Sequence, residues 1–541
     1  MNATVRPDFG ASWFAARAAG AFERPRLTFD LDVDVCVIGG GLAGLTAARE
    51  VARRGWSVAV LEARRVAWNA SGRNCGFVLP GFGADIRRMV ERVGIDRARE
   101  LWKLSEAGVE YVRATIRDTE MPGVEPVSGW LDVSKIDNGD ELLAIATLLG
   151  QEFGAAIEGW PTERVRAVLR SELYFHAIHY LNAFHIDPLN YAHGLARAAL
   201  AAGAVIFEET PALAIDPAGV RKRIATPSGR VRAAHIVLAG NAHLGSLVPG
   251  LAHTVLPVTG YAAVTAPLGE RLGAAIAYRG AVSDSRLADY HYRIVGGDRL
   301  MWAGGGGLLP RSPRAAASRF KAAIARTFPQ LGAVEFEHAW SGIMGFSLHR
   351  MPQVGEVIPG LWLAGAFGAH GLNTTAMAGG LIASAITEND DRWRLFQPYE
   401  LVWAGGRLGR VVRHVGTWSR GLEEDWAASL ARRREAVRRA EAEQAMPAAG
   451  PAPAEPAGTG PSIAESAVAG PKSPLVPEVE SLLRRAAHLG EPRKTGQPRA
   501  KRRMGRRPAP GRPEPAPPPA DPAAAPERDN PPFTGDSRRN E

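Results

Sequence analysis

The sequence contains very little cysteine, with only Cys36 and Cys75 among its 541 residues. Two cysteines exclude a disulfide framework and a cysteine-based zinc site, and they suit a reducing compartment. No run approaches eighteen consecutive apolar residues, so no membrane-spanning helix is predicted. Arg17 interrupts the apolar stretch near the start, which makes that stretch a poor signal peptide. These absences predict a cytoplasmic protein.

The sequence also lacks the pattern of a metal site. His176, His179 and His185 lie close together along the chain. They are not accompanied by acidic residues at the spacing that zinc sites use. We therefore predict no bound metal.

Length and composition predict one large domain, or two modest ones, with appendages. Hydrophobic residues make up 46% of the chain, which is enough for a sizeable core. From about residue 447, Ala, Pro, Gly and Arg dominate, and such a composition buries too little apolar surface to offset its ordering entropy. We expect an N-terminal extension at 1–30, a globular body at 31–400, a helical extension at 401–445 and a disordered tail at 446–541.

Much of the net charge of +9 lies near the end of the chain, where a basic cluster spans residues 484–507. One interpretation is contact with nucleic acid or with an anionic membrane surface. The alternative, which we favour, is a solvated tail without a partner.

A glycine-rich motif follows an apolar run at the start of the body. Residues 33–38 have the pattern of a strand buried on both faces, and residues 45–54 are predicted to form a helix. Between them, Gly39 would allow a tight turn and Gly41 a close approach to a pyrophosphate, while Gly44 would let the helix pack on the strand. The motif predicts a dinucleotide-binding βαβ unit.

A carboxylate stands where such a unit would bind a ribose. The second strand, with the sequence SVAVLEA, ends in Glu62. An acidic residue there accepts hydrogen bonds from the ribose hydroxyls of an adenine dinucleotide and disfavours the extra phosphate of NADP. The motif leaves NAD and FAD open.

A second strand–glycine–helix unit occurs about 320 residues later. It has a strand at 361–364, a glycine-rich turn and a helix that begins near Thr374. Two helix N-termini can converge on one long ligand, whereas a nicotinamide dehydrogenase usually needs only the first unit. The pair favours FAD, with the second unit receiving the far end of the cofactor.

Five motifs complete the pattern: VCVIGGGLAGLTAARE, VAWNASGRNCGF, HIDPLNYAHGLARAA, IVLAGNAHL and LWLAGAFGAHGLNTTAMAGGLIA. Together they resemble the D-amino-acid-oxidase-type FAD-dependent oxidoreductases, and in particular the members similar to gamma-glutamylputrescine oxidoreductase. The resemblance covers about residues 10–400. It implies an α/β fold with a discontinuous, Rossmann-like FAD-binding domain and a smaller antiparallel β-sheet substrate domain. The implied FAD-binding segments are about 31–90, 185–250 and 335–390, and the implied substrate-domain segments are about 91–184 and 251–334.

The resemblance also implies which residues bind FAD. The first glycines would contact the pyrophosphate, and Glu62 would contact the adenosine ribose. The SGRN loop would approach the flavin ring, Leu213 would lie by the adenine, and the start of the last helix would lie by the pyrimidine end. The implied set is Gly39, Gly41, Gly44, Glu62, Ser71, Gly72, Arg73, Asn74, Leu213, Gly365, Gly371, Leu372, Asn373 and Thr374.

The sequence departs from its relatives at two positions. The loop reads RNCG where relatives have RNGG, which brings Cys75 toward the flavin or else leaves it as a small packed residue. Relatives with covalent flavin use a cysteine just before the last glycine-rich unit; this chain has none there, so we predict non-covalent FAD. Asn373 stands where relatives that act on simple N-methyl amino acids tend to carry a lysine. That difference argues against sarcosine and glycine and favours an amine or a longer substrate.

The implied reaction is a two-electron oxidation in which a neutral amine gives the hydrogen on its α-carbon, as hydride, to flavin N5. The resulting imine then hydrolyses. His370 is a candidate contact to flavin or substrate, or a histidine satisfied by the backbone. Arg73 and Arg293 are candidates for binding a substrate carboxylate, or else structural ion pairs.

Aromatic residues on the later strands offer a wall for the amine. Their alternating spacing also suits plain packing, which we favour. The residues are Tyr261, Tyr290, Tyr292 and Trp302.

Two alternatives to an FAD-dependent amine or amino-acid oxidoreductase stay open at this point. One is an NAD-dependent dehydrogenase. The other is a flavin-bearing binding protein whose basic tail contacts nucleic acid or membrane. The electron acceptor, oxygen or another, is not encoded in any motif.

Overall fold

The computed structural model describes residues 12–19, 23–245, 247–248, 250–284, 290–305, 312–404, 433 and 435. These residues belong to a unit that spans Met1–Glu491. The tail expected at 446–541, with its basic cluster, lies outside the described residues, as does nearly all of the helical extension expected at 401–445.

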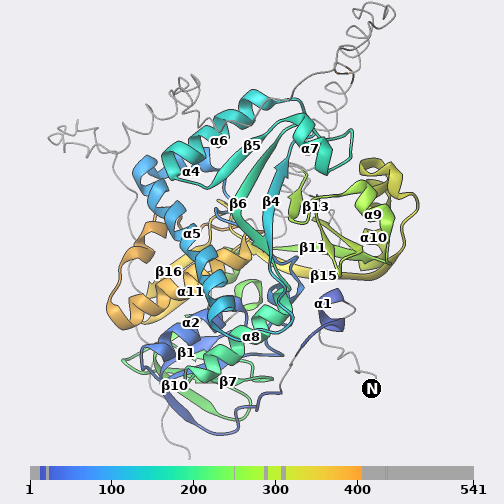
Figure 1. Cartoon of the computed structure of the whole chain (residues 1–541). Coiled ribbons are helices and arrows are strands. Elements are labelled where there is room, and N and C mark those ends of the chain that lie inside the picture. The colour runs from blue at the N-terminus through green and yellow to red at the C-terminus, as the bar shows by residue number, and fades with distance from the viewer. Residues whose placement is uncertain are drawn as a thin grey trace, which may run out of the picture. The chain divides into compact units, whose positions relative to one another are not determined.

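The first sheet has a parallel centre with the strand order of a dinucleotide-binding fold (Figure 1). β1 lies in the middle, with β2 and β7 on one side and β10 and β17 on the other. β16 pairs antiparallel with β17, β9 with β10, and β8 with β9. The bounds are β1 Leu31–Ile38, β2 Val58–Leu61, β7 Val205–Phe207, β8 Ala214–Asp216, β9 Lys222–Ala225, β10 Arg230–Leu238, β16 Gln353–Ile358 and β17 Leu361–Gly365.

The apolar run in β1 explains its central place. Val35 and Val37 point into one hydrophobic cluster, which they share with the helices, whereas Cys36 and Ile38 point into another on the opposite face. A strand that is apolar on both faces must be covered on both, as in parallel sheets. Helices α2 (Leu42–Arg53), α8 (Pro188–Ala201) and α11 (Gly371–Glu388) supply the cover on the first side.

The second sheet has nine strands in the order β15-β11-β14-β13-β12-β4-β6-β3, with β5 paired to β6. All pairs are antiparallel except β12 with β4, which are parallel. Figure 1 shows β4, β6 and β13 of this sheet on one side of α11, and β1 and β10 of the first sheet on the other. The bounds are β3 Phe77–Val78, β4 Val127–Val133, β5 Ile157–Trp160, β6 Ala177–His185, β11 Leu256–Thr265, β12 Ala281–Ser283, β13 Tyr290–Val295, β14 Arg299–Gly305 and β15 Phe336–Phe346.

The other helices flank these sheets. The long helix α5 packs against α11, and α10 packs on β11 and β15. The α-helices are α1 Trp13–Ala16, α3 Ala70–Arg73, α4 Ile86–Val93, α5 Ile95–Asp118, α6 Gly139–Phe153, α7 Thr162–Val168, α9 Glu270–Ala275 and α10 Pro313–Thr327. Short 3₁₀ turns are η2 Asn241–His243, η3 Leu251–His253, η4 Pro329–Leu331 and η5 Arg392–Phe396.

The α/β fold with a Rossmann-like sheet and a second, mainly antiparallel sheet is confirmed. The second sheet is not the smaller one in strand number, since the first has eight strands. β3 and β15 lie in ranges expected for the FAD-binding domain but pair in the second sheet, so the two parts interleave more than expected. The domain boundaries stay a prediction. Within the described part of the chain, no helix is both long and apolar enough to cross a membrane.

Candidate FAD and substrate site

The glycine motif lies at the crevice between β1 and β10, where the strand order of the first sheet reverses. Gly39 has φ +114°, a conformation that side-chain-bearing residues rarely adopt. A Cβ there would lie 2.8 Å from the carbonyl carbon of Ala239, at the end of β10. Such crevices are where open α/β sheets bind ligands.

The N-terminus of α2 points at this crevice. Gly41 is the N-cap and offers no side-chain cap. A Cβ on Gly44 would lie 2.0 Å from the carbonyl oxygen of Gly39, so only glycine lets the helix pack this closely. The Leu42 N–H is bonded to Ser71 Oγ at 3.1 Å, which brings the SGRN loop to the same place. A helix N-terminus whose N-cap residue supplies no side chain, beside a glycine turn, is suited to a phosphate group.

Glu62 lies beside the glycine turn. Its Oε2 accepts the Gly40 N–H at 2.7 Å, and its Oε1 accepts the Arg64 N–H at 2.8 Å. Burial raises the pKa of this carboxyl, while the two N–H donors act in the opposite direction. Because each carboxylate oxygen has a second lone pair, both remain able to accept a ribose hydroxyl.

The SGRN loop joins the two sheets. Gly72 packs so tightly that a Cβ would lie 2.5 Å from the carbonyl oxygen of Ala67. Asn74 closes the α3 turn by donating to the carbonyls of Ala70 and Ser71. On the β15 side, Arg73 donates to the Ser341 carbonyl at 3.3 Å and accepts, through its own carbonyl, the Trp340 indole N–H at 2.9 Å.

The N-terminus of α11 forms the other end of the site. Ala366 and Gly368 take positive φ values of 55° and 61° in the turn after β17. His370 is the N-cap, again without a side-chain cap, and a Cβ on Gly371 would meet nothing within 4 Å. The first turn of α11 therefore has no side-chain cap from its N-cap residue, and it borders open space. Leu372 and Thr374, in its first turn, are buried.

Asn241 is a residue that the sequence analysis did not assign to the site. It begins η2 directly after β10, with φ +49°. Its Oδ1 accepts the Ala366 N–H at 3.0 Å and lies next to Gly365 and Gly345. Asn241 thus fastens the second glycine unit to the end of β10. The only hint in the sequence is its place after a buried strand.

Asn373 faces the interior rather than the open space. It is 1% exposed, and its Nδ2 donates to the Gly81 carbonyl at 3.1 Å. Its buried Oδ1 has no partner in the parts of the chain that the structure describes. Leu213 faces outward, with 60% exposure, and its N–H is already bonded to the Ala225 carbonyl at 2.8 Å. An adenine contact from Leu213 would have to use its side chain or its carbonyl.

Arg293 is engaged within the protein. Its guanidinium is 2.5 Å from His185 Nδ1 and donates to the Ile186 carbonyl at 2.8 Å. Burial lowers its pKa to about 10. A Cβ on Gly76 would lie 3.0 Å from Nη2 of Arg293. These contacts favour the structural alternative, in which Arg293 clamps the turn after Cys75 to the end of β6.

Tyr292 lies in the core of the second sheet. It stacks on Trp302 with centroids 4.6 Å apart, and its hydroxyl donates to the Tyr174 hydroxyl at 3.1 Å. Tyr261 belongs to the same buried cluster, with Phe328 and residues of α10. The structure therefore favours packing for these aromatics over a wall for the substrate.

The opposite face of β13 carries His291, which the sequence analysis overlooked. The ring packs with Phe77 and Trp130, each with its centroid 5.8 Å from that of His291. Burial, and to a smaller extent the charge of His291, lowers the pKa of His370 to about 4. Strand β3, which carries Phe77, contacts α11, the helix whose N-cap is His370. The alternation in Tyr290, His291 and Tyr292 was visible in the sequence. The sequence did not show which of the two faces of β13 becomes part of the core.

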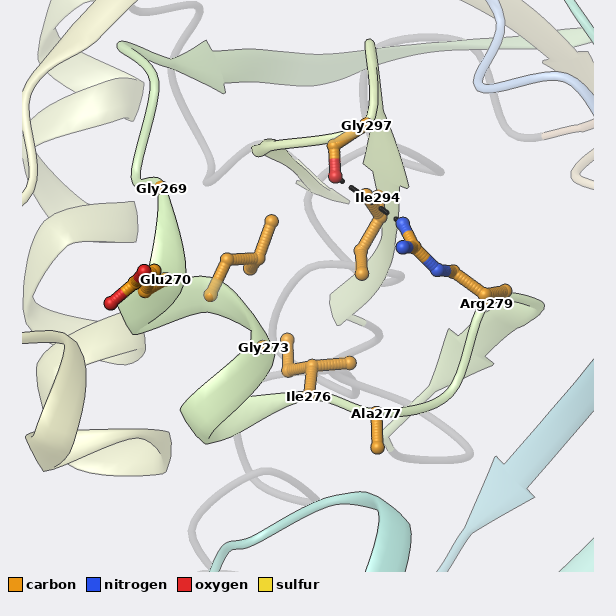
Figure 2. Close-up of a pocket in the computed structure, with 9 residues that line it drawn as sticks. Gly269, Glu270, Gly273, Ile276, Ala277, Arg279, Ile294 and Gly297 are labelled. Atoms are coloured by element: carbon orange, nitrogen blue, oxygen red, sulfur yellow. Dashed lines mark hydrogen bonds between the residues drawn. The ribbon is translucent and has the colours of Figure 1, made fainter.

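A separate pocket lies beside α9 on the other face of β13 (Figure 2). It has a volume of about 370 Å³, and Arg279 bridges it by donating to the Gly297 carbonyl at 3.3 Å. None of the expected FAD-binding residues lines it. The lining residues are Gly269, Glu270, Leu272, Gly273, Ile276, Ala277, Arg279, Ile294 and Gly297.

The residues at the crevice fit FAD. Two helix N-termini without side-chain caps serve the two ends of a long ligand, and Gly39 leaves room that any Cβ would fill. Among the described residues, none pairs with the buried Nδ1 of His370, as expected of a group that faces a ligand. Within the described ranges, no cluster of acidic, histidine or cysteine side chains is suited to a metal ion.

Comparisons with known proteins also indicate an FAD-dependent enzyme. The family model described as DAO, FAD dependent oxidoreductase, matches residues 34–385. Gamma-glutamylputrescine oxidoreductase of Escherichia coli is 31% identical over 408 residues, which cover 74% of this chain and 95% of that protein. A Haemophilus influenzae protein named as the oxidoreductase OrdL is 28% identical over 403 residues, which cover 73% and 92%.

Solved structures share the fold at lower identity. Glycine oxidase from Bacillus cereus has a TM-score of 0.55 at 20% identity, and the match covers 68% of this chain and 98% of that one. L-amino acid deaminase from Proteus vulgaris has a TM-score of 0.57 at 16% identity, with 71% and 99% covered. The chain therefore belongs to the DAO family of FAD-dependent oxidoreductases, and FAD is its cofactor.

Proposed function

We propose that this enzyme oxidises a primary or secondary amine at the carbon next to nitrogen, and that glycine and sarcosine are poor substrates. More generally, the protein is an FAD-dependent oxidoreductase that acts on amines or amino acids. The relative at 31% identity is named for an amine, γ-glutamylputrescine, whereas several structural neighbours are named for amino acids. These structural neighbours are all at or below 20% identity, so the sequence relative is the better guide to substrate.

The observation that carries the proposal is the engagement of Arg293. A guanidinium is the group best suited to hold a substrate carboxylate. In this chain, that of Arg293 is committed to His185 and to the Ile186 carbonyl. Asn373 adds no positive charge at the start of α11, where its amide is turned toward Gly81. An uncharged amine end therefore suits these surroundings better than a carboxylate.

Bound FAD would supply the electron chemistry by accepting a hydride, that is two electrons and a proton, from the substrate carbon; the amine nitrogen loses a proton, and the imine that results hydrolyses. The chain's own residues bind and orient. The N–H groups at the start of α2 would hold the pyrophosphate, and those at the start of α11 would stabilise negative charge at the pyrimidine end. The imidazole of His370 is neutral near pH 7, because burial holds its pKa at about 4.

Family membership removes the nicotinamide-dehydrogenase alternative. It also makes a purely binding role less suitable than enzymatic turnover. The basic tail on which that binding role rested lies outside the described residues. We propose that FAD is bound non-covalently, which acid precipitation would test by releasing the flavin into the supernatant.

The experiment is anaerobic mixing of the purified holoenzyme with γ-glutamylputrescine, putrescine, sarcosine, glycine and L-proline, while the visible flavin band is followed. Bleaching by an amine, at a rate well above that for the amino acids, is expected. Re-admitting air then separates an oxidase, which regains colour at once, from a dehydrogenase. Faster bleaching by glycine or sarcosine than by either amine would overturn the proposal.

A further inference from the structure

One face of the second sheet carries an aromatic group, and one of its strands, β3, contacts α11. It consists of Phe77 from β3, Trp130 from β4 and His291 from β13. The Phe77 and Trp130 rings meet edge to face with centroids 4.9 Å apart, and each lies 5.8 Å from the His291 centroid. Three strands that are distant in sequence thus build one apolar surface around a single imidazole.

The imidazole of His291 is unsatisfied. Its Nδ1 is buried and has no protein partner in the described part of the chain. The same holds for Nδ1 of His370, at the start of α11. Buried polar atoms are paired in most folded proteins, so an unpaired imidazole nitrogen on each of these two histidines points to a missing hydrogen-bonding partner.

The surroundings keep His291 neutral. Burial lowers the pKa of His291 to about 4, although the charge of Asp284, which follows β12, acts in the opposite direction. The carboxylate of Asp284 is itself held by the Lys135 ammonium at 2.9 Å and by the Tyr174 hydroxyl at 3.3 Å. A neutral imidazole has one nitrogen with a free lone pair, which accepts a hydrogen bond from an N–H donor.

We propose that His291 is a substrate-binding residue that accepts a hydrogen bond from the amine nitrogen, while Phe77 and Trp130 enclose the alkyl group next to it. The inference rests on the proposed function and deepens it, since it names the group that selects an amine. Neutral acceptors and ring faces suit an amine on an alkyl chain. They carry no positive charge to balance that of a carboxylate.

The test uses binding rather than turnover. tert-Butylamine has no hydrogen on the carbon that bears nitrogen, so it can occupy an amine site without being oxidised. Its binding to the holoenzyme is measured as a perturbation of the flavin absorption band. Pivalate, a carboxylate of nearly the same shape, is the matched probe and should bind at least about tenfold more weakly.

The variants separate a binding role from a structural one. His291→Phe should weaken tert-butylamine binding about tenfold or more, whereas His291→Gln, which keeps an acceptor, should stay within about threefold. His176→Phe is the matched control, because His176 lies in the same sheet region but pairs with Asp137 near the surface. It should bind as the unaltered enzyme does.

If His291→Phe does not retain FAD, His291→Ala is used instead, and added imidazole should restore tert-butylamine binding. Failure of the wild-type enzyme to bind tert-butylamine, or wild-type affinity in His291→Phe, would overturn the inference. So would an FAD-loaded His291→Ala variant that imidazole does not rescue. If tert-butylamine binding depends on His291 but no amine bleaches the flavin, the amine site stands and the proposed oxidation fails.

Discussion

Gly40 donates its backbone N–H to Oε2 of Glu62 over 2.7 Å, so the carboxylate expected to bind ribose also shapes the glycine turn. Its other oxygen is bonded to the Arg64 N–H at 2.8 Å. One side chain therefore ties the end of β2 to the turn after β1. Loss of the Glu62 charge should disturb both the glycine turn and the binding of FAD.

We expect Glu62→Gln to bind FAD about tenfold more weakly, because a side-chain amide has one acceptor oxygen where the carboxylate has two. One of the two backbone N–H groups would then face an NH₂ group. Release of FAD on dilution, followed by the rise in flavin fluorescence, measures the effect. Asp118→Asn, an exposed acid paired with Arg117, is the control. Unchanged FAD affinity in Glu62→Gln would contradict the role.

Gly39→Ala should abolish FAD binding and destabilise the apoprotein. The substitution combines an unfavourable φ of +114° with a Cβ 2.8 Å from the backbone of Ala239. Gly203→Ala is the matched control, because Gly203 has φ +102° but a Cβ there meets nothing within 4 Å. Strain alone costs about 1–3 kcal/mol, so the control should lose only that much. Thermal unfolding of both variants makes the comparison, and equal losses would show that the close approach to β10 is unimportant.

The sequence predicted those parts of the site that local backbone geometry dictates. Gly39 and Glu62 are recognisable because a tight turn and a strand end leave a local signature. His291 and Asn241 are not, because their roles depend on which strands meet in space. Alternation along Tyr290, His291 and Tyr292 defines two faces of a strand, but only the position of α10 decides which face becomes core.

The role of Arg293 could not be decided from the sequence for the same reason, because it depends on which segments meet in space. A buried arginine in a strand is compatible with binding a ligand and with a structural ion pair, and both alternatives were open from the sequence. The structure supplies the partners, His185 and the Ile186 carbonyl, which lie more than a hundred residues away along the chain.

Arg293→Met should therefore act on stability and not on substrate choice. It would leave the Ile186 carbonyl and His185 Nδ1 without their donor, which costs about 1–3 kcal/mol for each unsatisfied group. The midpoint of urea unfolding should fall, whereas the ratio of flavin-reduction rates with putrescine and with glycine should not change. A shift in that ratio without a loss of stability would show that Arg293 binds substrate after all.

Tyr292→Phe separates packing from catalysis in the same way. The phenyl ring keeps the stacking on Trp302 and loses only the hydrogen bond to the Tyr174 hydroxyl. We expect about 1 kcal/mol of lost stability, with kcat and KM for the best amine unchanged. A tenfold fall in kcat with unaltered stability would instead place the Tyr292 hydroxyl in the reaction.

The histidines at the site give the apoprotein a defined pH dependence. Burial holds the pKa of His370 at about 4, below its usual value of 6.5. Below pH 6.5 the unfolded chain takes up a proton at this position while the folded protein does not, so stability falls as the pH drops toward 4. Asp187, with a pKa raised to about 6 by burial, acts in the opposite direction, because the folded protein takes up its proton first.

Comparison with His370→Gln isolates the histidine, since Asp187 is present in both proteins. The free energy of urea unfolding of the wild-type apoprotein, relative to the variant, should fall by up to about 2–3 kcal/mol between pH 7 and pH 4. Because the residue His370 as a whole is only partly buried, this figure is an upper limit. A difference that stays constant with pH would show that His370 is protonated as readily in the folded protein as in the unfolded chain, and that the start of α11 is open to water.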